Sequence, residues 1–169
     1  GRLQREPPPV NAVALIGHMS LRIGAMAGDV HRPATDKEAA RMRARLAQSL
    51  AEGASGFSTG LYYPPNASAP TDEVIAVAEA LRGAGGIYVT HMRDEGDRVL
   101  DSIRESLQIG RAADVPIVIS HHKCTAPENF GRSTETLPLI AAAAQTQAVD
   151  FDVYPYAASS TVLPPEKVR

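Results

Sequence analysis

The chain has 169 residues, of which 44% are hydrophobic, so it can bury a sizeable core. Its formal net charge of -2 gives no support for a nucleic acid or an anionic membrane as partner and favours a small molecule. No apolar run approaches the roughly 20 residues of a membrane-spanning helix. The single cysteine, Cys124, cannot form an internal disulfide, which predicts a reducing compartment such as the cytoplasm. Because the chain begins at Gly1 without a methionine, we expect residues upstream.

Short apolar runs alternate with longer segments of helical period, a pattern typical of βα units with a parallel sheet. The predicted strands are residues 10–17, 56–59, 87–91, 117–121 and 149–154. The predicted helices cover about residues 35–50, 71–83, 99–110 and 133–144. Thr35 and Glu38 have the spacing of a capping box at the start of the first helix. The sequence predicts one α/β unit over residues 1–169 with about four and a half of the eight βα units of a full barrel. This unit is either a small open sheet or part of a (β/α)8 barrel.

Two connections are longer than the usual 2–6 residues between strand and helix. They are residues 19–34 and residues 60–70. Long loops after strand ends often carry ligand contacts in α/β enzymes, and they are equally often solvated turns. Both interpretations stay open for these two segments.

Polar side chains gather where the third and fourth predicted strands end. If the fourth strand is extended through residue 121, alternation places His121 and Lys123 on one face. His91 ends the third strand on the matching face, and adjacent parallel strands lie about 4.8 Å apart. The two imidazoles could therefore bind one ion, for which zinc is the natural candidate. A histidine at a strand end is also commonly a hydrogen-bonded structural residue, and two histidines do not complete a zinc shell.

Other histidines and the cysteine have more conservative interpretations. His122 is expected to face the helix layer, and Cys124 is expected to pack as a thiol, because alternation turns both away from His121. His18 either binds a ligand or caps its loop. His31 is expected to be solvated.

A charged run follows the third strand. Asp94, Glu95 and Asp97 are best interpreted as favourable charges at the start of the next helix, although a role in the site is the alternative. Arg93 fits either a structural or a substrate-binding role. After the fifth strand, Tyr154 could donate to a developing oxyanion or satisfy a buried carbonyl.

Five stretches are specific enough to compare with known families. They are GFSTGLYYPP (56–65), GIYVTHMRDEG (86–96), VISHHK (118–123), NFGRS (129–133) and DVYPYAA (152–158). In this order they closely resemble the N-acyl-D-amino-acid deacylases, or D-aminoacylases, of the amidohydrolase superfamily. The resemblance covers nearly the whole chain.

The resemblance implies a zinc-dependent (β/α)8 barrel that hydrolyses an N-acyl-D-amino acid to a carboxylate and a D-amino acid. It implies that His91 and His121 bind the metal ion. Lys123 matches the cation that binds the substrate carboxylate. Tyr154 and Ser160 match positions that line the substrate and support the scissile carbonyl, with Tyr154 as the catalytic donor.

The sequence also departs from the family. Members carry a His-x-His pair on the first strand, a ligating cysteine and an aspartate after the eighth strand, and none of these has a counterpart here. The resemblance therefore implies a central fragment of a deacylase, or a truncated relative, that is inactive alone. Two other functions stay open: a cyclic-amide hydrolase of the same superfamily, and a non-catalytic half-barrel that forms homo-oligomers through its open sheet edges.

Overall fold

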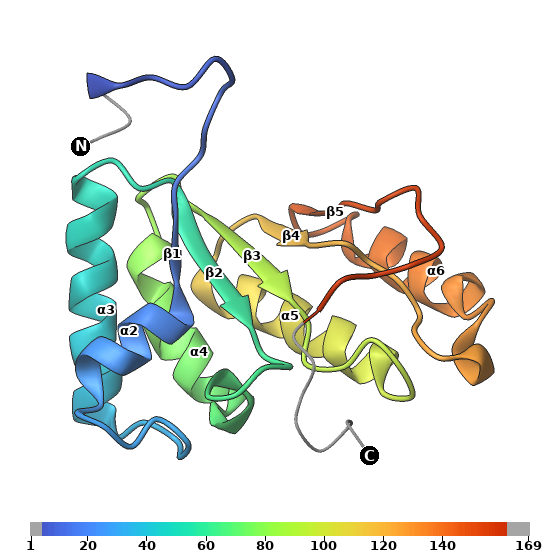
Figure 1. Cartoon of the computed structure of the whole chain (residues 1–169), viewed down its shortest axis with the longest axis horizontal. Helices are drawn as coiled ribbons and strands as arrows, with labels where there is room; N and C mark the ends of the chain where they lie inside the picture. The colour runs from blue at the N-terminus through green and yellow to red at the C-terminus, as the bar shows by residue number, and fades with distance from the viewer. Residues whose placement is uncertain (1–4, 162–169) are drawn as a thin grey trace.

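The computed structural model describes residues 5–161, which contain a five-stranded parallel sheet (Figure 1). The strands are β1 (Leu15–Gly17), β2 (Gly56–Gly60), β3 (Ile87–His91), β4 (Ile117–Ile119) and β5 (Val149–Phe151). The helices are α2 (His18–Ala25), α3 (Asp36–Ala51), α4 (Thr71–Ala78), α5 (Val99–Ala113) and α6 (Ser133–Ala143), with short 3-10 segments at Asn66–Ser68, Glu79–Leu81 and Pro127–Asn129. The ends of the predicted 1–169 unit, residues 1–4 and 162–169, lie outside the described residues.

Each strand pairs in parallel with the next strand along the chain, in the order β1-β2-β3-β4-β5. Parallel neighbours joined by crossovers of one hand place all the connecting helices on the same face. Figure 1 shows α4 and α5 lying behind the sheet, between α3 and α6, and each of these helices packs against the next. A doubly wound sheet would instead have helices on both faces. The predicted α/β class is confirmed, and the arrangement is that of successive units in a (β/α)8 barrel.

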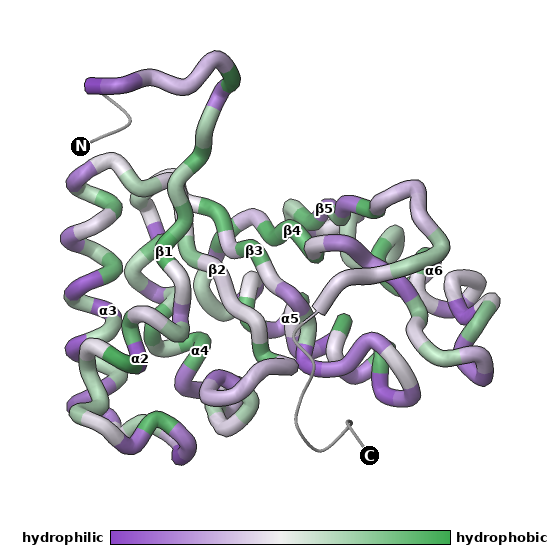
Figure 2. Tube along the Cα trace, in the orientation of Figure 1, coloured by the Kyte–Doolittle hydropathy of each residue, from purple (hydrophilic) through white to green (hydrophobic). Residues whose placement is uncertain are grey.

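The core lies between the sheet and these helices. Phe57 pairs in register with Tyr88, and Tyr88 pairs with Ile117, so the three side chains form one row across the sheet. Each is at most 1% exposed. A Cβ atom on Gly110 of α5 would overlap the Ile117 side chain, which shows that this row faces the helices. Figure 2 shows the matching alternation of hydrophobic and hydrophilic residues along α3.

The predicted helix starts are largely confirmed. Thr35 accepts a hydrogen bond from the Glu38 backbone nitrogen at 3.3 Å, and the Glu38 carboxylate accepts from the Thr35 backbone nitrogen at 2.8 Å. This is the predicted capping box. The helices α4, α5 and α6 begin at the predicted residues. Within the described part of the chain, no helix is long and apolar enough to cross a membrane.

Some predicted boundaries were wrong. The first strand covers three residues at the end of the predicted 10–17, and the fifth ends at Phe151 rather than at residue 154. The predicted 19–34 loop begins inside α2, which buries Leu21 and Ala25 against the core. This helix escaped prediction because its N-cap, Gly17, has no side chain that could signal a helix start.

His18 begins α2 and is fully buried. Its Nε2 lies 3.2 Å from the carboxylate of Glu73, which also pairs with the buried Arg22. Burial lowers the pKa of His18. Burial would raise the pKa of Glu73, but hydrogen bonding to His18 and Arg22 outweighs it and lowers that pKa. The contact with Glu73 is neither a ligand contact nor a loop cap, the two roles that the sequence left open for His18. His18 belongs instead to a buried polar cluster with Arg22 and Glu73 that joins α2 to α4.

Candidate functional site

A cavity of about 470 Å³ lies at the carboxyl edge of the sheet. Its walls come from the segments that follow β2, β3, β4 and β5, the usual place for ligands in parallel α/β folds. The lining includes all five residues to which the sequence assigns a role in the site. The residues that line the cavity include Tyr62, Tyr63, His91, Glu95, His121, Lys123, Glu128, Tyr154 and Ser160.

Two histidines meet at the floor of this cavity. Nδ1 of His91 lies 3.0 Å from Nε2 of His121, and the ring centroids are 4.7 Å apart. Two nitrogens bound to one tetrahedral zinc ion at about 2.0–2.1 Å each would be separated by about 3.3 Å. The structure therefore brings the two imidazoles together as the sequence predicted. Their role as metal ligands stays a prediction.

The route to this convergence differs from the predicted one. In the β3–β4 register Ile119 pairs with Thr90, and both are fully buried on the face opposite His91. An extended strand through residue 121 would therefore have turned His121 away from His91. Instead β4 ends at Ile119, and His121 adopts a left-handed backbone with φ of 42°. Its backbone nitrogen donates to Asp152 at 2.7 Å, which holds this turn.

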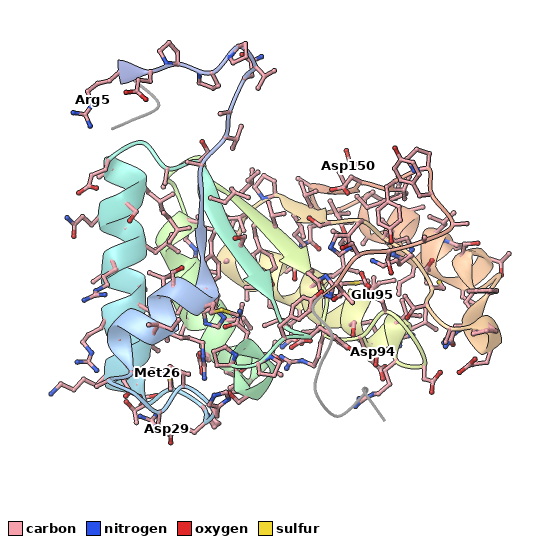
Figure 3. All side chains as sticks on the ribbon, in the orientation of Figure 1. Arg5, Met26, Asp29, Asp94, Glu95 and Asp150 are labelled. Carbon is pink, nitrogen blue, oxygen red and sulfur yellow. The ribbon has the colours of Figure 1, made fainter. Side chains whose placement is uncertain are left out.

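Glu95, for which the sequence left a role in the site as the alternative, belongs to this cluster (labelled in Figure 3). Its Oε1 lies 3.1 Å from Nδ1 of His121, and the Lys123 ammonium donates to the carboxylate at 2.7 and 2.8 Å. The interpretation of Glu95 as a charge in the first helical turn was wrong, because α5 begins only at Val99. His91, Glu95 and His121 offer ligand atoms that all lie within 4.8 Å of one another.

The substrate-binding candidates lie beside the histidines. The Lys123 ammonium also donates to the His121 carbonyl at 2.9 Å and lies 5.6 Å from the centroid of the Tyr154 ring. Ser160 is exposed at the wall of the same cavity. The structure thus brings all five predicted site residues to one cavity.

The 60–70 connection also reaches this cavity. The ring centroids of Tyr63 and His91 are 4.8 Å apart, and those of Tyr62 and His91 are 5.9 Å apart. The Tyr63 hydroxyl makes a 2.8 Å hydrogen bond with the Thr161 hydroxyl, which joins the loop after β2 to the segment after β5 at the wall of the cavity. Burial lowers the pKa of His91, which favours the neutral imidazole that binds metals. This loop therefore lines the cavity, and ligand contact by it stays a prediction.

Arg93, whose role the sequence left open between structure and substrate binding, makes structural contacts. It pairs with Glu105 at 2.8 Å and donates to the carbonyls of Ala67 and Ala69. Asp94 is also labelled in Figure 3, and its Oδ1 accepts from the backbone nitrogen of Gly96 at 2.8 Å. Both side chains therefore hold the loops around the cavity.

The conservative interpretations of three other residues agree with the structure. His122 is buried, and its Nε2 makes a 2.9 Å hydrogen bond with Thr136 of α6. Cys124 is half-buried against the core, and burial raises the pKa of its thiol. His31 is exposed.

No protein-family model matches the chain. A D-aminoacylase of Alcaligenes xylosoxydans xylosoxydans is 51% identical over 166 residues, which are 98% of this chain and 34% of that protein. The chain resembles part of an N-acyl-D-amino-acid deacylase. An N-acyl-D-aspartate deacylase of the same organism is 49% identical over 99% of this chain and 34% of that protein. The chain therefore spans about a third of the length of both relatives.

Solved structures show the same partial match. The crystal structure of a D-aminoacylase, described as defining a novel subset of amidohydrolases, superposes with a TM-score of 0.88 at 50% identity, covering 91% of this chain and 32% of that one. An N-acyl-D-glutamate deacylase from Bordetella bronchiseptica superposes with a TM-score of 0.92 at 41% identity, covering 98% of this chain and 35% of that one. That enzyme is complexed with zinc and a phosphonate mimic of the tetrahedral intermediate. With the consecutive strand order, these matches confirm the predicted partial barrel.

Proposed function

We propose that this chain forms the middle of the barrel of a zinc-dependent N-acyl-D-amino-acid deacylase, as one α/β unit over residues 1–169. The observation that carries the proposal is the 3.0 Å approach of His91 Nδ1 to His121 Nε2 at the carboxyl edge of the sheet. The deacylase that superposes with a TM-score of 0.92 holds zinc. The reaction is the hydrolysis of the amide bond to a carboxylate and a free D-amino acid.

The donor set of the site fits zinc. Two neutral imidazoles are preferred zinc ligands, and their spacing leaves room for one ion with further ligand positions open. Zinc, when bound there, supplies Lewis-acid chemistry toward an amide carbonyl. His91 and His121 are the residues of this chain that would hold it. Burial lowers the pKa of His91, which favours the neutral imidazole that this role needs.

The remaining cavity residues are proposed to handle the substrate. Lys123 pairs with the substrate carboxylate, and this charge-assisted contact fixes the amide relative to the metal site. Tyr154 lies beside Lys123 and donates its hydroxyl proton in a hydrogen bond to the oxygen that becomes negative in the transition state. Ser160 lines the substrate. A cavity of about 470 Å³ is large enough for a small molecule.

We propose that the 169-residue chain has little or no activity by itself. Within residues 5–161, the candidate ligand cluster consists of His91, Glu95 and His121. The chain corresponds to about 34% of its relatives, so a complete catalytic set is expected to need other parts of the polypeptide.

The test is product analysis with the native polypeptide that contains this chain. We expect it to release a D-amino acid from an N-acetyl-D-amino acid, and we expect His91→Ala and His121→Ala each to abolish the release. Turnover of a cyclic amide without any D-amino-acid release would show the other amidohydrolase function instead. Full activity of the isolated chain would refute the proposal that it needs the rest of the polypeptide.

We propose the cytoplasm as the compartment, because the single cysteine suits a reducing environment. β1 and β5 are the end strands of the described sheet, and strand edges favour pairing with further strands. We propose that neighbouring strands of the same barrel cover them. A stable dimer of the chain in sedimentation, without bound metal, would support the self-associating half-barrel instead.

A further inference from the structure

We propose that Glu95 is a positioning residue of this site, which holds His121 in the tautomer that binds metal and places the Lys123 ammonium at the cavity wall. This inference rests on the proposed metal site. It concerns a residue that touches neither the reacting amide nor the ion. It depends on three contacts of one carboxylate.

The first contact fixes the imidazole. His121 uses its two ring nitrogens in different directions, with Nε2 3.0 Å from His91 and Nδ1 3.1 Å from Glu95. A carboxylate accepts a hydrogen bond, so the Nδ1 beside it carries the proton. The lone pair is then on Nε2, where Nδ1 of His91 also points. Carboxylate–histidine pairs of this kind orient metal ligands in many zinc proteins.

The second and third contacts hold the carboxylate. Lys123 donates to both oxygens of Glu95, at 2.7 and 2.8 Å, and the Glu95 side chain is 9% exposed. A nearly buried carboxylate without a counter-charge would be costly, and the ammonium removes that cost. The Glu95 carbonyl accepts from the Thr125 backbone nitrogen at 2.7 Å, which ties this loop to the segment that carries Lys123.

Direct metal ligation by Glu95 is the competing role. An ion shared by His91 and His121 would be held by Nε2 of His121, whereas the Glu95 carboxylate lies at Nδ1 of the same ring. To bind that ion, Glu95 would have to release both Nδ1 and Lys123. Lys123 would then lose the only carboxylate that pairs with it among the ion pairs of residues 5–161. The observed geometry therefore favours positioning over ligation.

The arrangement also links the metal site to the substrate site. Lys123 lies 2.9 Å from Nδ1 of His121, and a nitrogen that carries a proton cannot accept from an ammonium. The Nδ1 proton would therefore go to Glu95, and Lys123 would keep the Glu95 carboxylate and the His121 carbonyl as its partners. Glu95 thus contacts both the candidate metal ligand His121 and the substrate-binding candidate Lys123.

The test compares Glu95→Ala with Glu95→Gln in the native polypeptide, by competition with a zinc chelator and without substrate. Glu95→Ala is expected to weaken zinc binding about 10- to 100-fold. Glu95→Gln keeps an oxygen that accepts from Nδ1–H and should lose less than about tenfold. Glu128→Gln, which removes another carboxylate from the wall of the cavity, is the matched control and should leave zinc binding unchanged. Circular dichroism verifies that each variant is folded.

A second measurement needs no variant. Long-range nitrogen NMR of the zinc-loaded protein should show His121 protonated at Nδ1 and metal-bound at Nε2. Equal losses of zinc in the alanine and glutamine variants, or a His121 bound through Nδ1, would overturn the inference. These readouts are independent of substrate. A protein that shows the predicted zinc pattern but releases no D-amino acid would refute the proposed reaction and leave the role of Glu95 standing.

Discussion

His91 Nδ1 and His121 Nε2 lie 3.0 Å apart although the two residues are separated by 30 positions in the chain. The backbone places the two residues in different ways. His91 is the last residue of β3, whereas His121 lies beyond β4 in a left-handed conformation that the Asp152 carboxylate holds. The site therefore depends on the end of a strand and on one turn, and both lie at the carboxyl edge of the sheet.

Removing the Lys123 charge should affect the binding of the substrate carboxylate. In the native polypeptide, Lys123→Met should raise KM for an N-acyl-D-amino acid about 10- to 100-fold, as expected for losing a hydrogen bond to a charged group. Steady-state kinetics with an N-acyl amine that lacks the carboxylate supplies the control. KM for that substrate should rise much less, because an effect through the Glu95 carboxylate acts on both substrates alike. A KM difference of the same size on both substrates would refute carboxylate recognition by Lys123.

Loss of the Tyr154 hydroxyl should act mainly on turnover. Tyr154→Phe keeps the ring that lies 5.6 Å from the Lys123 ammonium and removes the proposed oxyanion donor. We expect kcat to fall about 100- to 1000-fold with little change in KM. Tyr156→Phe, at an exposed ring stacked on Tyr154, is the control and should keep wild-type kcat. An unchanged kcat in Tyr154→Phe would remove this residue from the reaction.

The buried cluster of His18 and Glu73 should make the fold sensitive to acid. Burial lowers the pKa of His18 from 6.5, so below pH 6.5 the unfolded chain binds more protons at this residue than the folded chain. Stability should therefore fall as the pH drops below 6.5. The lowered pKa of Glu73 adds a further loss below pH 4.5, in the same direction.

Denaturant unfolding across this pH range measures the effect. His18→Gln should flatten the pH dependence between pH 6.5 and the folded-state pKa of His18. The same substitution at the exposed His31 should leave the pH dependence intact. Parallel curves for wild type and His18→Gln would show that His18 does not contribute.

Local sequence patterns predicted most of the fold. Alternating apolar strands and helical periods indicated the parallel α/β class, and the Thr35–Glu38 pair located the start of α3. α2 escaped because Gly17 precedes it without a capping side chain. A helix start can be predicted when a capping side chain marks it in the sequence. α2 has no such side chain and is held instead by the burial of Leu21 and Ala25, which only the structure shows.

The sequence predicted which residues gather at the site, but it did not predict the backbone conformation that brings them together. His91, His121 and Lys123 could be grouped because they end adjacent strands. The left-handed turn at His121 could not be foreseen, because it depends on Asp152 more than 30 residues away. The preferred helix-start role of Glu95 was wrong for a similar reason: a hydrogen bond from the Thr125 backbone nitrogen to the Glu95 carbonyl holds its loop, and no short motif encodes this long-range contact.

The proposed zinc site of His91 and His121 can be tested by the zinc content of the purified native polypeptide, measured by elemental mass spectrometry after exhaustive dialysis. We expect near-stoichiometric zinc in the wild type and in His31→Ala, which changes an exposed histidine, and loss of zinc in both His91→Ala and His121→Ala. Folded wild-type protein without zinc, or zinc retained by both variants, would contradict it.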